Sequence, residues 1–114
     1  MSVIIVAETW EGKFKKATFE AVSYGARVAA MAGTDAVAVI IGALTDDAKT
    51  LGKYGAAKVV NVTGDFKSFT NATFANVVKQ IADQHAGTIF IISGTNNGKM
   101  LAPALAVQAD AALI

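Results

Sequence analysis

The sequence contains no cysteine, one proline and one histidine among its 114 residues. Without cysteine it has no disulfide, no thiolate metal site and no cysteine nucleophile, which is compatible with a reducing compartment. With one histidine and no cysteine, we do not expect a transition-metal site. We therefore expect His85, at the end of a predicted helix, to cap that helix or to lie in solvent.

Charge is also scarce. Charged residues make up 17% of the chain, against about 25% in an ordinary domain, and the net charge is +1. This balance gives no broad attraction for nucleic acid or an anionic membrane, so we expect neither as a partner. No apolar run approaches the roughly 18–20 residues that cross a bilayer. Ser2 leads directly into an apolar run, so no signal or transit peptide is predicted.

Apolar residues, by contrast, make up 54% of the chain. That is ample for one core, and the length fits a single domain over residues 1–114. A small domain this poor in charge often leaves apolar surface for a partner, which makes self-association of the isolated domain a further expectation. Alanine is very frequent, however. The excess of apolar residues is therefore equally well explained by alanines within helices, without any apolar surface for a partner.

Four short apolar runs predict β-strands, at residues 3–7, 36–41, 58–62 and 89–92. The first, Val-Ile-Ile-Val-Ala, is β-branched and does not alternate with polar residues, which is typical of a strand buried on both faces of a parallel sheet. Residues 111–114 resemble the beginning of a fifth strand. We interpret the chain as one domain of a longer protein.

Helical patterns separate these strands, at residues 14–32, 45 to 51 or 54, 72–84 and 98–109. In the first helix Gly25 allows a close approach to the sheet and Gly33 provides a left-handed end. Its predicted apolar stripe comprises Phe14, Ala17, Ala21, Tyr24, Val28 and Ala32. The last helix contains Pro103, which predicts a distorted second turn.

The short second helix has Thr45 as its expected N-cap, with Asp46 and Asp47 in its first turn, where negative charge is favourable. Residues 8–13 read as a polar loop in which Trp10 covers the core. Lys13, Lys15 and Lys16 form a small basic group for which a solvated face is the default interpretation.

The regular alternation of strands and helices predicts an α/β fold: a doubly wound, mostly parallel, Rossmann-like sheet with helices on both faces. Such sheets bind ligands beyond the carboxyl ends of their strands, where the strand order reverses. We expect the first and fourth strands to be neighbours there. The candidate residues lining a crevice between them are Glu8, Gly94, Thr95, Asn96, Gly98 and Lys99. The alternative is that these are ordinary small residues of strand–helix turns.

The segment Gly94-Thr95-Asn96-Asn97-Gly98-Lys99 superficially resembles a phosphate-binding P-loop. One intervening residue is missing, however, and Met100 stands where the magnesium-binding hydroxyl belongs. Helix amides and Lys99 would together hold one anion; alternatively, Asn97 caps the helix and Lys99 is solvated.

Catalytic motifs are also missing. No G-x-G-x-x-G follows the first strand, and Ser93 lies in no G-x-S-x-G elbow. Since no nucleophile, base and orienting group assemble in the pattern, we predict no catalytic residue.

Three stretches carry a resemblance to a known family: SVIIVAETWEGKFKKATFEAVSYG, GAAKVVNV and GTNNGKMLAPALAVQADAALI. Together they resemble the N-terminal domain of the alpha subunit of electron transfer flavoprotein. The third is similar to the family's Gly-x-x-x-Gly-Lys-x-Leu-x-Pro-x-Leu-Ala segment, in which the internal proline is unusual. The resemblance covers essentially all of the chain.

The resemblance implies an adenine nucleotide alpha hydrolase-like layer, with FAD held mainly by a C-terminal domain outside this chain. It implies a beta subunit as the partner, and electron transfer from acyl-CoA or other dehydrogenases through the complex. The chain would then be a non-catalytic scaffold that packs on the beta subunit, frames the flavin domain and binds no FAD tightly by itself. The implied compartment is the bacterial cytoplasm or the mitochondrial matrix.

Two alternatives belong to the same fold class. An adenine-nucleotide-binding module of the universal-stress-protein type would show G-x-x-G-x(9)-G-[ST] after the fourth strand, which this loop lacks. A hydrolase or ligase would need an S-G-G-x-D loop after the first strand, where this chain has AETWEG.

Overall fold

The computed structural model describes residues 2–10, 13–42, 44–62, 71–92 and Leu105. Its centre is a four-stranded parallel sheet in the order β5-β4-β1-β6. The strands are β1 (Ser2–Val6), β4 (Asp35–Ile41), β5 (Lys58–Val62) and β6 (Gly87–Ile92). A separate antiparallel pair, β2 (Thr9–Trp10) and β3 (Lys13–Phe14), follows β1.

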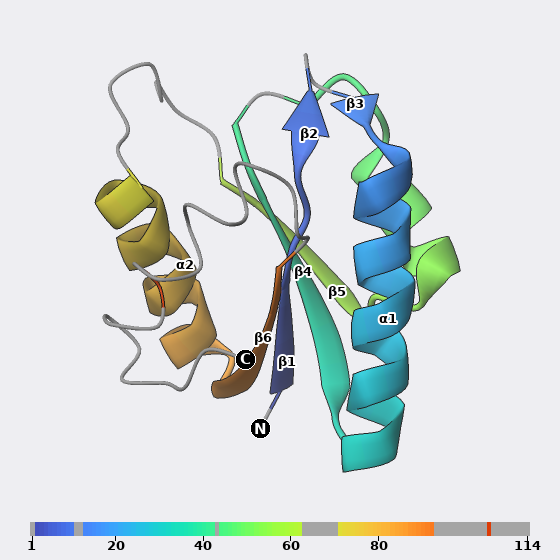
Figure 1. Ribbon diagram of the computed structural model, residues 1–114, viewed down its shortest axis with the longest axis vertical. Coiled ribbons are helices and arrows are strands. Elements are labelled where there is room, and N and C mark those ends of the chain that lie inside the picture. Colours follow the sequence, from blue (N-terminus) through green and yellow to red (C-terminus); the bar gives the residue numbers. More distant parts are fainter. Residues whose placement is uncertain (1, 11–12, 43, 63–70, 93–104, 106–114) are drawn as a thin grey trace.

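Helices cover both faces of the sheet (Figure 1). The α-helix α1 (Lys16–Ala32) and the 3-10 helix η1 (Ala48–Tyr54) pack on one face, and α2 (Asn71–Gln84) packs on the other. The predicted doubly wound α/β class is therefore confirmed. The four predicted strands are all present, with ends displaced by at most two residues.

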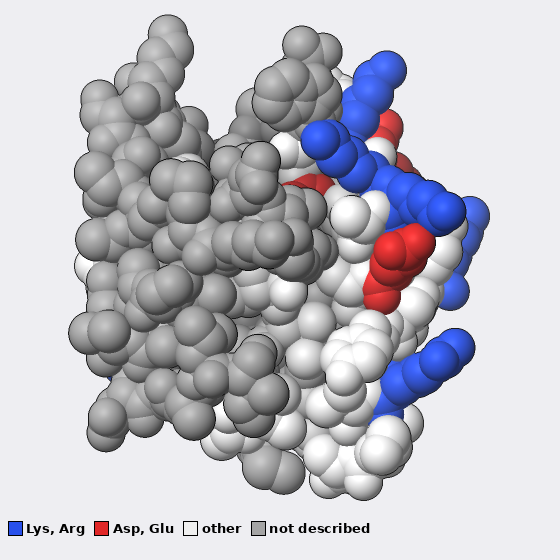
Figure 2. All heavy atoms as spheres, in the orientation of Figure 1, with Lys and Arg blue, Asp and Glu red and all other residues white. Residues whose placement is uncertain are grey.

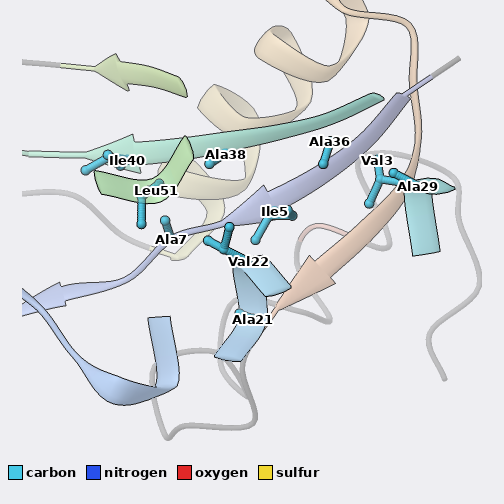
Figure 3. Close-up of a cluster of buried hydrophobic side chains, with 10 residues drawn as sticks. All are labelled: Val3, Ile5, Ala7, Ala21, Val22, Ala29, Ala36, Ala38, Ile40 and Leu51. Carbon is cyan, nitrogen blue, oxygen red and sulfur yellow. The ribbon is translucent and has the colours of Figure 1, made fainter. Parts of the chain in front are cut away.

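The strand β1 is buried on both faces, as its uninterrupted β-branched run predicted. Val3 and Ile5 point toward α1 and η1 and are 0% exposed, in a cluster with side chains of β4 (Figure 3). Ile4 and Val6 point the other way, toward α2. Alternation of side chains along one strand thus supplies two cores at once.

The helix α1 lies close to the sheet at Gly25. A Cβ atom at this position would lie 2.5 Å from both Cδ1 and Cγ1 of Ile5, well inside the contact distance of real side chains. The predicted role of Gly25 in a close approach is confirmed. Gly33 also ends α1 as predicted, with φ 69° and its N–H donating to Ala29 and Ala30 carbonyls.

The predicted apolar stripe of this helix was out of phase. The buried residues of α1 are Thr18, Ala21, Val22, Gly25 and Ala29, whereas Tyr24 is 61% exposed. The prediction followed the large side chains. The buried face instead centres on Ala21, Gly25 and Ala29, with Thr18 and Val22 beside them, and glycine and alanine there let the backbone approach the sheet closely.

The start of α1 was also predicted too early. Phe14 belongs to β3, where it pairs with Thr9, and Trp10 is a strand residue rather than part of a loop. The backbone N–H of Phe14 donates to Asp46 Oδ2 at 2.9 Å, so this amide is engaged outside the helix. The pairing of Phe14 with Thr9 therefore takes this residue out of the predicted helix.

The second helix differs from its prediction in type and in cap. It is a 3-10 helix that begins after Asp47, whose Oδ1 accepts a hydrogen bond from the Lys49 N–H at 3.0 Å. Thr45 is therefore not the cap, and Asp46 lies outside the first turn. The predicted end at Gly55 is confirmed, with φ 111°.

The helix α2 was predicted one residue short at its beginning. Val78 and Ile81 are buried on the expected face, with Phe74 and Val77 half-buried. Of the predicted helix 98–109 only Leu105 is described: it is helical, 2% exposed and packs in the α2-side cluster. Pro103 and the predicted strand 111–114 lie outside the described residues.

We expect Gly25→Ala to destabilise the protein. Alanine is favoured over glycine in a helix by about 1 kcal/mol, but overpacking against the buried Ile5 side chain costs about 1–3 kcal/mol. The net loss, up to about 2 kcal/mol, is measurable by urea denaturation.

Gly52→Ala is the matched control, since a Cβ atom at this position would have no other atom within 4 Å and the φ of Gly52 is not positive. We expect this substitution to be neutral or slightly stabilising. If Gly25→Ala changed the stability in the same direction and to the same extent as Gly52→Ala, the close approach would be contradicted.

Candidate functional site

The carboxyl edge of the sheet is formed by the ends of β1, β4, β5 and β6. From β1 the chain passes to β4 and β5 on one side, whereas β6 pairs with β1 on the other side. The strand order therefore reverses at β1, and the first and fourth predicted strands are neighbours as expected. Open α/β sheets bind ligands at such a reversal, so this edge is the candidate site.

Glu8 lies at this edge, immediately beyond the end of β1. It is half-buried, and its backbone carbonyl accepts a hydrogen bond from the Thr18 hydroxyl of α1. Thr18 is 0% exposed and also accepts a hydrogen bond from the Lys15 N–H, at 3.2 Å. One buried hydroxyl thus ties the turn after β1 to the first turn of α1, which fixes where Glu8 leaves the sheet.

Backbone hydrogen bonds continue past the strand ends. The Ala7 N–H donates to the Val39 carbonyl at 2.9 Å, which extends the β1–β4 ladder by one residue. The Gly42 N–H donates to the Val62 carbonyl at 2.8 Å, with φ 111° at Gly42. Because a left-handed conformation favours glycine, Gly42 lets the chain turn sharply where β4 ends.

Asp46 joins the loop after β4 to the β2–β3 pair. Its Oδ2 accepts the Phe14 N–H at 2.9 Å, across 32 residues of sequence. The carboxylate was predicted to stabilise a helix start; its role is instead to anchor one edge loop to another. On the side of β4 the candidate site is thus bordered by a loop that a side-chain hydrogen bond joins to β3.

The described edge does not bring together a set of metal ligands. In the described part of the chain, no three histidine, cysteine, aspartate or glutamate side chains lie close enough to hold a metal ion. The half-buried His85, beyond the other end of the sheet, accepts a hydrogen bond from Ser2 Oγ at its backbone carbonyl, at 2.8 Å. What the described edge offers to a ligand is therefore mostly backbone and small side chains.

Most of the predicted site residues fall beyond the described structure. Gly94, Thr95, Asn96, Gly98 and Lys99 lie outside the described residues, as does Ser93. Glu8 is placed at the edge, and its approach to the 94–99 segment stays a prediction.

Sequence reasoning also missed two residues that shape the edge. For Thr18 the sequence gives a weak indication of such a role, because it is a polar residue among the small residues of one helix face. For the partner of Asp46 the sequence gives no indication, because this partner is the backbone amide of Phe14, 32 positions away.

The parallel sheet and the reversal of its strand order at β1 define the class of the protein: it is an α/β layer with a nucleotide-binding-like fold. The family model of the electron transfer flavoprotein domain matches residues 3–114. The chain therefore belongs to the electron transfer flavoprotein domain family, as its resemblance predicted. In the described part of the chain, no helix has the length and apolar character needed to span a membrane.

Two curated relatives show the extent of the match. The chain is 30% identical over 106 residues to the acryloyl-CoA reductase electron transfer subunit beta of Anaerotignum propionicum, covering 91% of this chain and 29% of the relative. It is 29% identical over 114 residues to the electron transfer flavoprotein subunit alpha of Bacillus subtilis, covering 98% of this chain and 34% of the relative. The chain thus spans about a third of the length of these relatives.

A solved structure supports the fold. The universal stress protein of Archaeoglobus fulgidus superposes with a TM-score of 0.62 over 100% of this chain and 96% of that chain, at 14% identity. At this identity the likeness shows the fold alone.

We expect Thr18→Val to destabilise the protein more than Thr18→Ser. Valine matches the shape but leaves the Glu8 carbonyl without its hydroxyl donor, at a cost of about 1–3 kcal/mol. Serine keeps both hydrogen bonds and removes one buried methyl group, at a cost of about 0.8 kcal/mol.

Chemical denaturation measures the two losses, and amide hydrogen exchange at Lys15 reports the bond to Thr18 directly. If Thr18→Val left both the stability and the amide exchange of Lys15 unchanged, packing alone would account for the contribution of Thr18 to stability.

Proposed function

We propose that this chain is the N-terminal layer of an alpha-type electron transfer flavoprotein subunit. In this role it packs against a beta-type subunit and frames the FAD-carrying part of its own subunit. It serves electron transfer from acyl-CoA or other dehydrogenases and carries no catalytic constellation itself. The observation that carries the proposal is the family match over residues 3–114, within relatives about three times as long.

The assignment to an alpha-type subunit rests on two supports. The Bacillus subtilis alpha subunit matches over 98% of the chain. The Gly98-Lys99 pair, followed by Pro103, also resembles the alpha-subunit segment. The relative named a beta subunit is an electron transfer component as well, so both names are compatible with the same role.

The two-sided core supports a scaffold role. β1 is almost fully buried between α1 and α2, and the turn at Glu8 is fixed to α1 by Thr18. A rigid layer of this kind holds an edge in place for a neighbouring domain. A universal-stress-type nucleotide module remains the alternative, and the fold likeness at 14% identity does not favour it as a function.

Co-expression with a beta-type electron transfer flavoprotein subunit tests the proposal. With an affinity tag on the full-length protein, we expect the two subunits to co-purify in equal amounts and to retain FAD. Under the same conditions, residues 1–114 alone should give no tight binding in a flavin fluorescence titration.

Two outcomes would count against the scaffold role. Tight FAD binding by residues 1–114 would place the flavin site within this layer. A rise in melting temperature with AMP or ATP, without co-purification of the beta-type subunit, would favour the nucleotide-binding module.

A further inference from the structure

Five exposed lysines gather on one corner of the molecule. They come from three elements: β3, the beginning of α1, and η1. Figure 2 shows lysine and arginine side chains concentrated on this side of the surface, over β3 and the beginning of α1. We call this set the lysine patch: Lys13, Lys15, Lys16, Lys49 and Lys53.

Aromatic contacts hold the three elements together beneath the patch. The rings of Phe14 and Phe19 meet edge to face at 5.8 Å, and those of Phe19 and Tyr54 stack at 4.5 Å. The Phe14 N–H bond to Asp46 adds a link between β3 and the turn before η1. The backbone beneath the lysines is therefore fixed, and Tyr54 presents a ring that is 40% exposed.

The positive excess of the described structure resides in this corner. Five of the eight described lysines and arginines belong to the patch, beside three carboxylates, Glu20, Asp46 and Asp47. Outside it, three basic residues are balanced by three acidic ones. The Lys16–Glu20 pair, at 3.9 Å between exposed side chains, neutralises little because water screens it.

We propose that the lysine patch, with the Tyr54 ring beside it, binds the acidic surface of another protein. Exposed tyrosine is a frequent anchor in protein interfaces, and lysines around it steer an oppositely charged partner. A nucleic acid fits less well, because Glu20, Asp46 and Asp47 would repel a uniformly charged phosphate chain. Separate carboxylates on a protein surface can each meet one lysine and avoid these positions.

The patch lies beside the candidate site. The β2–β3 pair leaves the carboxyl end of β1 directly, and Asp46 ties β3 to the loop after β4. A protein bound on the patch would therefore lie next to the carboxyl edge of the sheet. This proposal concerns a protein other than the sister subunit and rests on described residues only, so it goes beyond the proposed function.

Binding of a fluorescein-labelled glutamate-rich peptide to the full-length protein, followed by anisotropy, tests the proposal. We expect Lys13→Gln with Lys53→Gln to weaken binding by about tenfold and to flatten the loss of affinity between ~0.05 and ~0.3 M salt. Tyr54→Ala should weaken it by a factor that changes little with salt. The peptide assay needs neither flavin nor a sister subunit, so its result is independent of the co-purification test.

The matched control is Lys58→Gln with Lys79→Gln, which changes the net charge equally on β5 and α2. We expect about a twofold loss or less. Equal losses for the two double variants would show that only net charge matters and would overturn the proposal. Tighter binding of a single-stranded oligonucleotide, or of phosphatidylserine vesicles, than of the peptide would overturn it too. Melting temperatures establish that each variant is folded.

Discussion

The burial of β1 on both faces is the constraint on which the described structure depends. A central strand of a parallel sheet has no face left for water, so both of its side-chain rows must find apolar partners. Val3 and Ile5 meet α1 and η1, and Ile4 and Val6 meet α2. The same strand pairs with β4 and β6 and so creates the reversal of strand order. The core and the candidate edge thus both follow from the position of β1 at the centre of the sheet.

That constraint also explains part of the unusual composition. A helix packed closely on a sheet needs small residues on its inner face, and α1 places Ala21, Gly25 and Ala29 there. Ala36 and Ala38 of β4 face the same cluster. Seven of the described alanines are buried in the two cores, so this part of the alanine content is core rather than exposed docking surface.

The sequence predicted the strands and the fold class well because β-branched runs and regular alternation are local signals. It predicted the phase of α1 wrongly, because the large Tyr24 side chain outweighed Gly25 in the pattern although close packing favours the small residue. The hydrogen bond of Asp46 joins the loop after β4 to β3 across 32 residues, so no short window of sequence contains both partners. Thr18 and Glu8 are only ten residues apart, but their bond runs from a side chain to a backbone carbonyl, which a residue pattern does not reveal. The position of Glu8 at the edge could be predicted from the expected topology. The hydrogen bond from Thr18 to its carbonyl could be seen only in the three-dimensional structure.

The proposed electron-transfer role calls for two kinds of contact. A lasting subunit contact benefits from a rigid layer, since a rigid surface loses little conformational freedom when it binds. A partner that must arrive and leave benefits instead from charge, which raises the rate of association more than the final affinity. The lysine patch has this second character: exposed charges stand on three elements that the rings of Phe14, Phe19 and Tyr54 join. The lysine patch is therefore suited to a transient partner of the proposed role.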